Sequence, residues 1–453
     1  MQEIVNKQRT YYFSGATRPY AFRVEQLKKL QNMLKTYEKD IYRALKADLN
    51  KSKHEAITTE LGVLHTEIDF ALKHLKDWME DEEVPAPLTH KGSNSYITYE
   101  PYGVTLVIAP WNYPLQLALA PVIGALAAGN TVVLKPSEIS VHTSNLLNKM
   151  ISATFEPEIC TVVEGAVEET NALLEQRFDY IFFTGSTHIG KIIMEKASKH
   201  LTPVTLELGG KSPTIVDEDC NISLSAKRIV WGKYTNAGQT CVAPDYVYVH
   251  EKIYMKFLRA LKRQIHRLYG KRPLNNKDYG RIINKKHFDR LTKLLEDAKI
   301  YHGGEVSKEN LTIEPTIVTD ITWNDPVMQE EIFGPILPVL SYSNIDEVIL
   351  KVQENDKPLA LYYFGNNKEN EEKVLTSIPF GGGCVNDTLY HLATPYLPFG
   401  GVGPSGIGAY HGKYSFETFS HRKSILKQTT LFDNPVRYPG GRIKQSLAKS
   451  FLM

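Results

Sequence analysis

Apolar residues recur at helical spacing in two long stretches near the N-terminus. Residues 22–48 and residues 54–80 each carry a stripe of leucine and isoleucine with charged residues between the apolar positions. A period of three to four residues predicts two long amphipathic helices, and we expect their charged faces to be solvated surface. The stripes consist of Leu27, Leu30, Leu34, Ile41 and Leu45 in the first stretch and of Leu61, Leu64, Ile68, Leu72 and Leu75 in the second.

The pattern changes after the second stretch. Residues 84–99 (VPAPLTHKGSNSYITY) are rich in turn formers and end in alternating, strand-like positions. Such a segment predicts an extended excursion from the body of the protein, such as a hairpin. Nothing in the neighbouring sequence offers it an apolar surface to pack on.

From Val104 onward, short apolar runs alternate with helical sequence. This alternation predicts a parallel sheet covered by helices on both faces. A second region of the same kind begins near Ser212 and continues to about Gly403, so the fold class is α/β. The first strands are predicted at residues 104–109, 131–134, 161–164 and 180–183, with a helix at residues 115–128.

Length, composition and charge indicate a globular protein with more than one domain. A chain of 453 residues exceeds what a single growing core supports, so we expect two or three domains. Its hydrophobic content of 42% and charged content of 23% are ordinary for a globular protein. The 53 basic and 51 acidic residues leave a net charge of +2, which argues against a nucleic-acid surface.

The cysteines and the N-terminus indicate a cytoplasmic protein. The four cysteines are scattered, without a CxxC pair, which argues against a disulfide framework or a thiolate metal site and fits a reducing compartment. The first residues, MQEIVNKQRTYYFSG, lack a signal-peptide core. No run of about eighteen apolar residues occurs, so we expect no transmembrane span.

The C-terminal tail, residues 436–453, is basic. It contains four lysine and arginine side chains and no acid: Arg437, Arg442, Lys444 and Lys449. A basic amphipathic tail could contact anionic lipid weakly. A frayed or docked terminal helix is the alternative interpretation.

Candidate chemistry begins with Cys241, in the segment NAGQTCVAPDY. This run of small and polar residues has neither helical nor strand periodicity. Reactive cysteines need partial access to solvent and help in forming the thiolate, and such a loop can supply both. A cysteine that only packs is an equally good interpretation of the local sequence.

Two further segments carry groups that would complement a nucleophile. Glu207, in LELGGKSP, lies at the end of an apolar strand, where burial would raise its pKa and suit it to general-base catalysis. Asn112, in PWNYP, follows the strand VTLVIA, where its amide could stabilise an oxyanion. A buried, paired glutamate and a routine turn asparagine are the structural alternatives.

Other strand exits are suited to a phosphate and a ribose. LKPSE places Lys135 and Glu138 after one strand, and FTGSTHIG opens a helix at about Thr187 after another. Backbone N–H groups at Gly185 and Ser186 would then form an anion site. The spacing is neither G-x-G-x-x-G nor a P-loop. The glycine-rich segment at residues 397–423 predicts a close-fitting loop.

Taken together, these segments resemble the aldehyde dehydrogenase superfamily. The matching blocks, from Pro110 to about Lys423, are PWNYP, LKPSE, FTGSTHIG, LELGGKSP, NAGQTCVAPDY, EEIFGPILP, GGGCVND and PFGGVGPSG. The short N-terminus and GAYHGKYSFETFSHRK are similar to the class 3 branch, which handles fatty and aromatic aldehydes. Within that branch the chain also resembles bacterial enzymes that act on carotenoid-derived aldehydes.

The resemblance implies roles for individual residues. Cys241 matches the nucleophile, Glu207 the general base, and Asn112 the oxyanion-hole side chain that works with the backbone N–H of Cys241. Other residues match positions that bind the cofactor in the family. Lys135 and Glu138 match the adenosine ribose site, Gly185, Ser186 and Gly190 the pyrophosphate site, and Glu331 and Phe333 the nicotinamide site. Trp111 and Leu208 are also expected to contact the cofactor. The implied substrate is a medium- or long-chain aliphatic, aromatic or polyene aldehyde. The resemblance implies no metal ion in the site.

The resemblance also implies a cofactor and an architecture. Glu138 should accept a hydrogen bond from a ribose 2′-OH and repel a 2′-phosphate, so we expect NAD to be preferred and NADP accepted. We expect a homodimer. The expected division is an NAD(P)-binding domain at residues 1–82 and 101–207, a catalytic domain at 208–403, a bridging element at 83–100 and 415–435, and the tail at 436–453.

Two other functions remain open on the residues alone. A cofactor-independent cysteine hydrolase could pair Cys241 with His411, although a lone loop histidine is more often a structural hydrogen-bond partner. In a hydrolase, the segments at residues 135–138 and 185–190, which suit a nucleotide, would have no function. A non-catalytic homologue is disfavoured, because Asn112, Glu207 and Cys241 are all present.

Overall fold

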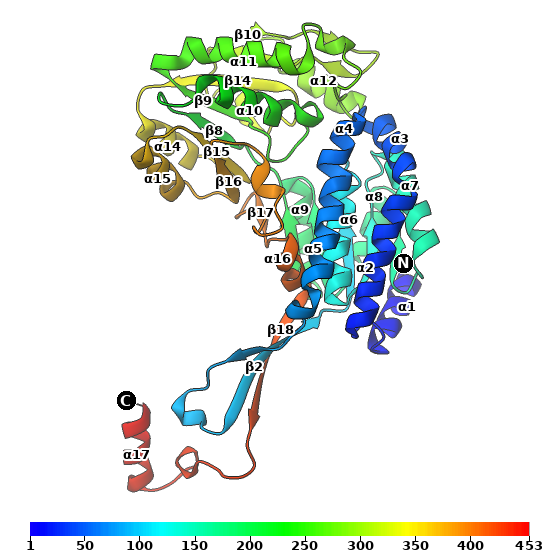
Figure 1. Ribbon diagram of the computed structural model, residues 1–453, viewed down its shortest axis with the longest axis vertical. Helices are drawn as coiled ribbons and strands as arrows, with labels where there is room; N and C mark the ends of the chain where they lie inside the picture. Colours follow the sequence, from blue (N-terminus) through cyan, green and yellow to red (C-terminus); the bar gives the residue numbers. More distant parts are fainter. Residues whose placement is uncertain (453) are drawn as a thin grey trace.

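The computed structural model describes residues 1–452. Two large sheets, each with its own helices, form the body of the molecule, and a narrow arm extends from it (Figure 1). The C-terminal helix α17 (Arg442–Leu452) lies at the far end of this arm. Among these residues, none of the helices combines the length and the apolar character that crossing a bilayer requires.

The N-terminal helices differ from the two that the apolar pattern predicts. The stretch at residues 22–48 forms two helices, α2 (Tyr20–Thr36) and α3 (Glu38–Leu49), because the chain turns at Tyr37. The stretch at residues 54–80 forms α4 (Lys53–Ala56) and α5 (Gly62–Trp78), joined by a π-helical turn at Ile57–Leu61. A further helix, α1 (Gln2–Phe13), precedes them.

Burial confirms the apolar stripes but corrects the prediction for the charged faces. Leu27, Leu30 and Leu64 are fully buried, as their spacing predicts. Glu60 and Glu67, which the sequence assigned to solvated surface, are also buried. Their partners come from segments distant in sequence, so the helical pattern alone could not reveal them.

The first sheet has six strands in the order β17-β7-β6-β3-β4-β5. Five are parallel, as predicted, and only β17 runs antiparallel. The order reverses between β3 and β6, and ligands of such sheets bind at the carboxyl ends of strands beside this reversal. The strands are β3 (Val104–Ile108), β4 (Thr131–Lys135), β5 (Cys160–Val162), β6 (Tyr180–Thr184), β7 (Val204–Glu207) and β17 (Gly406–Ile407).

Helices cover both faces of this sheet. All thirteen residues of α6 (Gln116–Ala128) are buried, because the helix packs between the sheet and the helices α2, α5 and α16 (Gly412–Thr418). A helix that is apolar on every side requires such a central position. The other helices of this region are α7 (Val141–Thr154), α8 (Val167–Leu174) and α9 (Thr187–Ser198).

The second sheet has seven strands in the order β10-β13-β14-β9-β8-β15-β16. All neighbouring strands are parallel except β10 and β13. The strands are β8 (Pro213–Val216), β9 (Tyr246–His250), β10 (Lys299–His302), β13 (Thr316–Thr319), β14 (Ile336–Tyr342), β15 (Ala360–Phe364) and β16 (Gly382–Val385). The accompanying helices are α10 (Ile222–Tyr234), α11 (Tyr254–Tyr269), α12 (Lys285–Lys293), α13 (Pro326–Gln329), α14 (Ile345–Gln353) and α15 (Lys368–Ser377), with a small hairpin of β11 (Val306–Ser307) and β12 (Thr312–Ile313).

The arm is a three-stranded sheet of distant segments. The predicted excursion forms β1 (Glu82–Val84) and β2 (Ser93–Pro101), and β2 pairs antiparallel with β18 (Ser420–Gln428) over the whole of both strands. The segment at residues 397–423, predicted as a loop, also contains the helix α16 (Gly412–Thr418). The predicted tail extends to Met453, which lies outside the described residues.

Candidate active site

Cys241 lies where two cavities meet. It follows a short 3₁₀ turn, Thr235–Gly238, in which Asn236 and Ala237 have left-handed φ values of 53° and 52°. One cavity, of about 540 Å³, is largely apolar. The other, of about 630 Å³, lies at the strand-order reversal of the six-stranded sheet, and Cys241 lines both. We call them the apolar cavity and the switch-point cavity.

Glu207 is the last residue of β7 and lines the switch-point cavity. Its side chain is buried, and neither carboxyl oxygen has a hydrogen-bond partner among the described residues. Burial raises the pKa of this carboxyl well above its usual value, as the sequence predicted. A carboxyl in this state can take up a proton near neutral pH.

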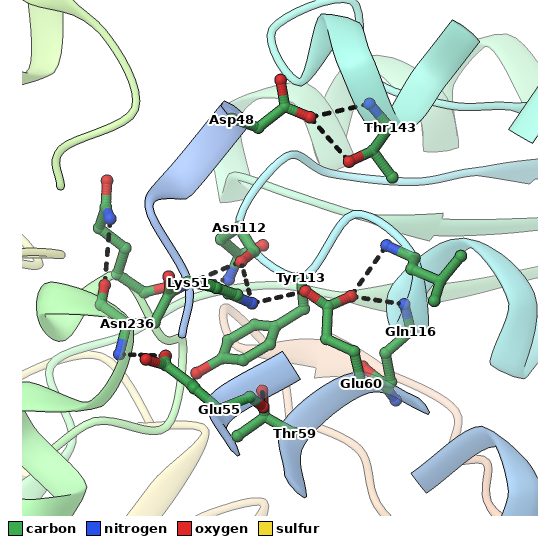
Figure 2. Close-up of polar contacts among 12 residues, drawn as sticks. Asp48, Lys51, Glu55, Thr59, Glu60, Asn112, Tyr113, Gln116, Thr143 and Asn236 are labelled. Carbon is green, nitrogen blue, oxygen red and sulfur yellow. Dashed lines mark hydrogen bonds and ion pairs between the residues drawn. The ribbon is translucent and has the colours of Figure 1, made fainter. Parts of the chain in front are cut away.

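Asn112 belongs to the turn after β3 and lines the same cavity as Glu207 and Cys241. The side chain is buried, and its Nδ2 donates to the carbonyl oxygen of Gln239 at 3.1 Å (Figure 2). A primary amide has two N–H groups, so one remains for a ligand. Because Gln239 belongs to the loop that carries Cys241, this hydrogen bond holds the amide against that loop.

Burial and two carboxylates act on the thiol of Cys241. Burial raises the pKa of the Cys241 thiol, and the carboxylates of Glu331 and Glu207 raise it further. The backbone N–H groups of Cys241 and Val242 act in the opposite direction. The resting group is therefore a thiol, and its reaction as a nucleophile requires a nearby proton acceptor.

The switch-point cavity is lined by the turns that follow β3, β6 and β7. Ser186 is the N-cap of α9, and its hydroxyl accepts from the backbone N–H of Ile189 at 3.4 Å. The other N–H groups of that first turn have no intrahelical partner and suit an anion. The residues predicted for cofactor that line this cavity are Trp111, Gly185, Ser186, Leu208, Glu331 and Phe333.

These residues fit a dinucleotide. The hydroxyl of Thr184, which lines the cavity, is buried without a hydrogen-bond partner among the described residues and could bond a ligand. The Trp111 and Phe333 rings meet edge to face, with centroids 5.4 Å apart. Removal from water, and then the charge of Asp245, raise the pKa of Glu331 to about 8.

Three predicted cofactor residues lie outside the lining of the switch-point cavity. Lys135 ends the next strand, β4, and its Nζ is 3.2 Å from Glu138 Oε2. Gly190 lies on α9 under Leu208, where a Cβ would approach Leu208 Cδ2 to 2.6 Å. This glycine therefore allows close helix packing. The roles of Lys135 and Glu138 at a ribose remain predictions.

The apolar cavity is bounded by aromatic and aliphatic side chains, including Trp231, Val242, Phe399 and Tyr410. His411 also lines it, but its Nδ1 is hydrogen-bonded to Glu67 Oε1 at 2.8 Å and its ring stacks on Tyr410. The imidazole is therefore held by a carboxylate, and no hydrogen bond joins it to Cys241 among the described residues.

The sequence did not indicate the polar contacts around this site. Tyr113 and Thr240 share a hydrogen bond beside the predicted residues, and a buried ion pair of Lys51 and Glu60 lies behind Asn112. A charged residue on an amphipathic helix carries no local sign of burial. The described residues contain no cluster of three or more metal-ligating His, Cys, Asp or Glu side chains.

Comparisons with known proteins agree with this geometry. The model of the aldehyde dehydrogenase family matches residues 3–425. The chain is 47% identical over 445 residues to 4,4'-diaponeurosporen-aldehyde dehydrogenase of Staphylococcus aureus, covering 98% of this chain and 97% of the relative. It is also 47% identical to the dimeric NADP-preferring aldehyde dehydrogenase of Mus musculus, covering 97% of both chains.

Solved structures show the same fold. The substrate-bound state of Staphylococcus aureus AldH matches with a TM-score of 0.98 and 46% identity, covering 100% of this chain and 99% of that one. An NAD-dependent aldehyde dehydrogenase from Sinorhizobium meliloti matches with a TM-score of 0.85 and 26% identity, covering 95% and 87%.

Proposed function

The chain belongs to the aldehyde dehydrogenase family and oxidises aldehydes to carboxylic acids with NAD or NADP, and we propose that it does so through a thioester on Cys241. The observation that carries this proposal is the position of Cys241 at the junction of two cavities. The apolar cavity would deliver the aldehyde, and the switch-point cavity would hold the cofactor.

Covalent catalysis would begin with the thiol of Cys241. Burial keeps this group protonated, so the proton must leave before the sulfur attacks the aldehyde carbon. That proton would pass to water in the open cavity, so that Glu207 remains available for the later hydrolysis. Attack then forms the C–S bond and places negative charge on the former carbonyl oxygen.

Asn112 would stabilise that oxyanion. Its free amide N–H, together with the backbone N–H of Cys241, would supply two donors to the oxyanion, and both residues line the cavity. When bound, NAD would supply the hydride acceptor, and loss of hydride from the adduct would leave a thioester on Cys241. Trp111, Glu331 and Phe333 would orient the nicotinamide end of the cofactor.

Glu207 would act in the following step, as the base for hydrolysis. Its two unpartnered oxygens can orient a water molecule and take its proton as the hydroxide attacks the thioester carbon. The C–S bond then breaks, the acid leaves, and Cys241 recovers its proton. The carboxylate must face the cavity rather than a partner side chain, and its lack of a hydrogen-bond partner fits this requirement.

The substrate class would be medium- or long-chain aliphatic, aromatic or polyene aldehydes. Aromatic and aliphatic walls favour an apolar aldehyde over a charged one. We further propose that NAD is preferred and NADP accepted, because the carboxylate of Glu138 would bond a 2′-OH and repel a 2′-phosphate. A chain-length series of aldehydes, compared by kcat/KM with each cofactor, tests both statements.

Assembly and location are also proposals. The outer edges of β16 and β18 are unpaired among the described strands, and such edges favour pairing with a second copy in a homodimer. Four free cysteines favour a reducing cytoplasm. The basic tail would touch membranes only weakly. Sedimentation of the full chain, with and without anionic vesicles, tests the dimer and the membrane contact.

The decisive experiment follows NADH absorbance after an apolar aldehyde such as hexanal is added with NAD. We expect turnover by the parent protein and none by Cys241→Ser. Cys384→Ser is the matched control, because Cys384 is another partly buried cysteine. Undiminished turnover by Cys241→Ser would refute the proposal, whereas ester cleavage without NAD binding would favour the hydrolase alternative.

A further inference from the structure

The segment that joins α3 to α5 buries an ion pair behind the candidate oxyanion hole. Lys51 Nζ and Glu60 Oε1 are 2.6 Å apart, and both side chains are fully shielded from solvent. Removing two charges from water is costly, and the attraction between them often fails to repay that cost. A contribution to the free energy of unfolding is therefore not a sufficient explanation for this ion pair.

Glu60 also holds the start of helix α6. Its second oxygen, Oε2, accepts from the backbone N–H groups of Leu115 and Gln116, each at 2.9 Å (Figure 2). The N-cap of α6 makes no side-chain capping bond of its own. A carboxylate there satisfies two orphan donors and complements the helix dipole. Because α6 follows the turn that contains Asn112, Glu60 fixes one end of that turn.

Lys51 holds the turn at Asn112 itself. Its Nζ donates to the Asn112 carbonyl oxygen at 3.1 Å and lies 3.8 Å from the centre of the Tyr113 ring. The same carbonyl accepts from Asn236 Nδ2 at 2.8 Å. The Asn112 peptide is thus held from two sides, by Lys51 and by the loop that leads to Cys241.

The π-helical turn makes this grip geometrically feasible. In an α-helix, Glu60 would point about 140° away from Glu55, five residues earlier. The inserted residue of a π turn places side chains five apart on the same face. Glu55 can therefore accept from the Asn236 backbone N–H at 2.7 Å while Glu60 reaches Lys51. The Gly62 N–H closes the turn on the Ile57 carbonyl.

We propose that Lys51 and Glu60 are positioning residues that hold the Asn112 amide in its oxyanion-binding orientation. The inference rests on the proposed role of Asn112. The ion pair fixes the Asn112 peptide and the start of α6, so the side-chain amide faces the Cys241 loop without reorganisation. Neither Lys51 nor Glu60 lines the cavity where the chemistry is proposed, so both act through Asn112.

The test uses the full-length protein with Lys51→Met and Glu60→Gln combined. This change removes both charges of the pair together and keeps an acceptor for the α6 N–H groups. Three rates are compared: hexanal oxidation with NAD, hydrolysis of 4-nitrophenyl acetate without NAD, and alkylation of Cys241 by iodoacetamide. The first two pass through a tetrahedral oxyanion at Cys241, and alkylation does not.

We expect kcat for hexanal and the ester rate each to fall by about tenfold or more, because a displaced donor loses part of the 10²–10³-fold effect of a single oxyanion donor. KM for NAD and the alkylation rate should stay within about twofold. A general disruption of the site would lower all three rates together and would overturn the proposal. Unchanged kcat would overturn it as well.

A double-mutant cycle separates positioning from an independent effect. In an Asn112→Ala background, the pair substitution should lower kcat by less than about twofold, because the group that it positions is already absent. Equal fold-losses in both backgrounds would refute the inference while leaving the proposed function intact. The proposed function fails on a different result, the absence of aldehyde-dependent NADH in the parent protein.

Two further variants guard against misinterpretation. Arg9→Met with Asp179→Asn removes a different ion pair, partly buried and of 2.7 Å, that joins α1 to the residue preceding β6, away from the site. It should lower the thermal unfolding temperature and leave the three rates unchanged. If the Lys51 and Glu60 double variant does not fold, Glu60→Asp alone, which keeps both charges but shortens the carboxylate side chain by one methylene, should give the same pattern at smaller amplitude, and a uniform loss of all rates there would again overturn the proposal.

Discussion

The hydroxyl groups of Tyr113 and Thr240 lie 2.6 Å apart and share a hydrogen bond. Tyr113 follows Asn112 in the turn after β3, and Thr240 precedes Cys241. The two buried side chains therefore connect the candidate oxyanion donor and the candidate nucleophile, one residue away from each. A second connection, from Asn112 Nδ2 to the Gln239 carbonyl, runs parallel to it.

Loss of this connection should slow the chemical step. We expect Tyr113→Phe to lower kcat by about fivefold, because the net contribution of a neutral hydrogen bond is about 1 kcal/mol. Steady-state NADH formation with hexanal measures this effect. Tyr248→Phe serves as the control, since the Tyr248 hydroxyl accepts from Trp323 away from the cavities. Equal kcat values for Tyr113→Phe and the parent would show that the contact does not align the site.

The role proposed for Glu207 predicts a change in the rate-limiting step. Glu207→Gln keeps the volume of the side chain but removes the base, so the thioester should form and then hydrolyse slowly. We expect a rapid burst of about one NADH per site, followed by a steady state slowed by about 10²-fold or more. Stopped-flow absorbance resolves the two phases. A parental steady-state rate would exclude Glu207 as the base for hydrolysis.

The same carboxyl predicts how the reaction depends on pH. Burial raises the Glu207 pKa, and the base is the ionised form, so its population falls as pH is lowered through that raised pKa. We expect kcat to decline on acidification at a pH well above the value at which an exposed glutamate protonates. Profiles of kcat against pH measure this limb. A decline confined to pH values near 4.5 would contradict the burial effect.

His391 predicts a pH dependence of stability rather than of rate. Burial lowers its pKa to about 4 from the ordinary 6.5, and the Nε2 atom has no partner among the described residues. Between these two values the unfolded chain binds a proton that the folded chain does not. The free energy of unfolding should therefore fall with decreasing pH, by about 1.4 kcal/mol per pH unit for this group.

Thermal unfolding between pH 7 and pH 5 measures that loss. His391→Gln should flatten the dependence, because glutamine does not titrate. His90→Gln, at an exposed position of the arm, is the matched control and should leave the slope as it is in the parent. Indistinguishable slopes for the parent and His391→Gln would rule out His391 as the source.

Much of the fold followed from local patterns. The strands near residues 104, 131 and 180 and the helix that begins at Thr187 form as predicted, because alternating apolar runs and helical segments have few other ways to bury their surfaces. The two N-terminal helices were only partly predicted. The break at Tyr37 and the π-helical turn at Ile57–Leu61 leave the apolar stripes nearly intact, so the stripes could not reveal them.

The sequence by itself determined which candidate functional side chains stand at the ends of the strands. Asn112, Glu207 and the glycine and serine before α9 stand at exits of parallel strands, and such exits gather at one edge of a sheet whatever the loops do. Tertiary structure alone decided which charges would be buried. Lys51 and Glu60 resemble ordinary surface residues in sequence, and they are shielded only because α6 and the Asn112 turn pack over them. A local pattern records which face of a helix is apolar, whereas the partner of a buried charge is supplied by a segment that the pattern does not contain.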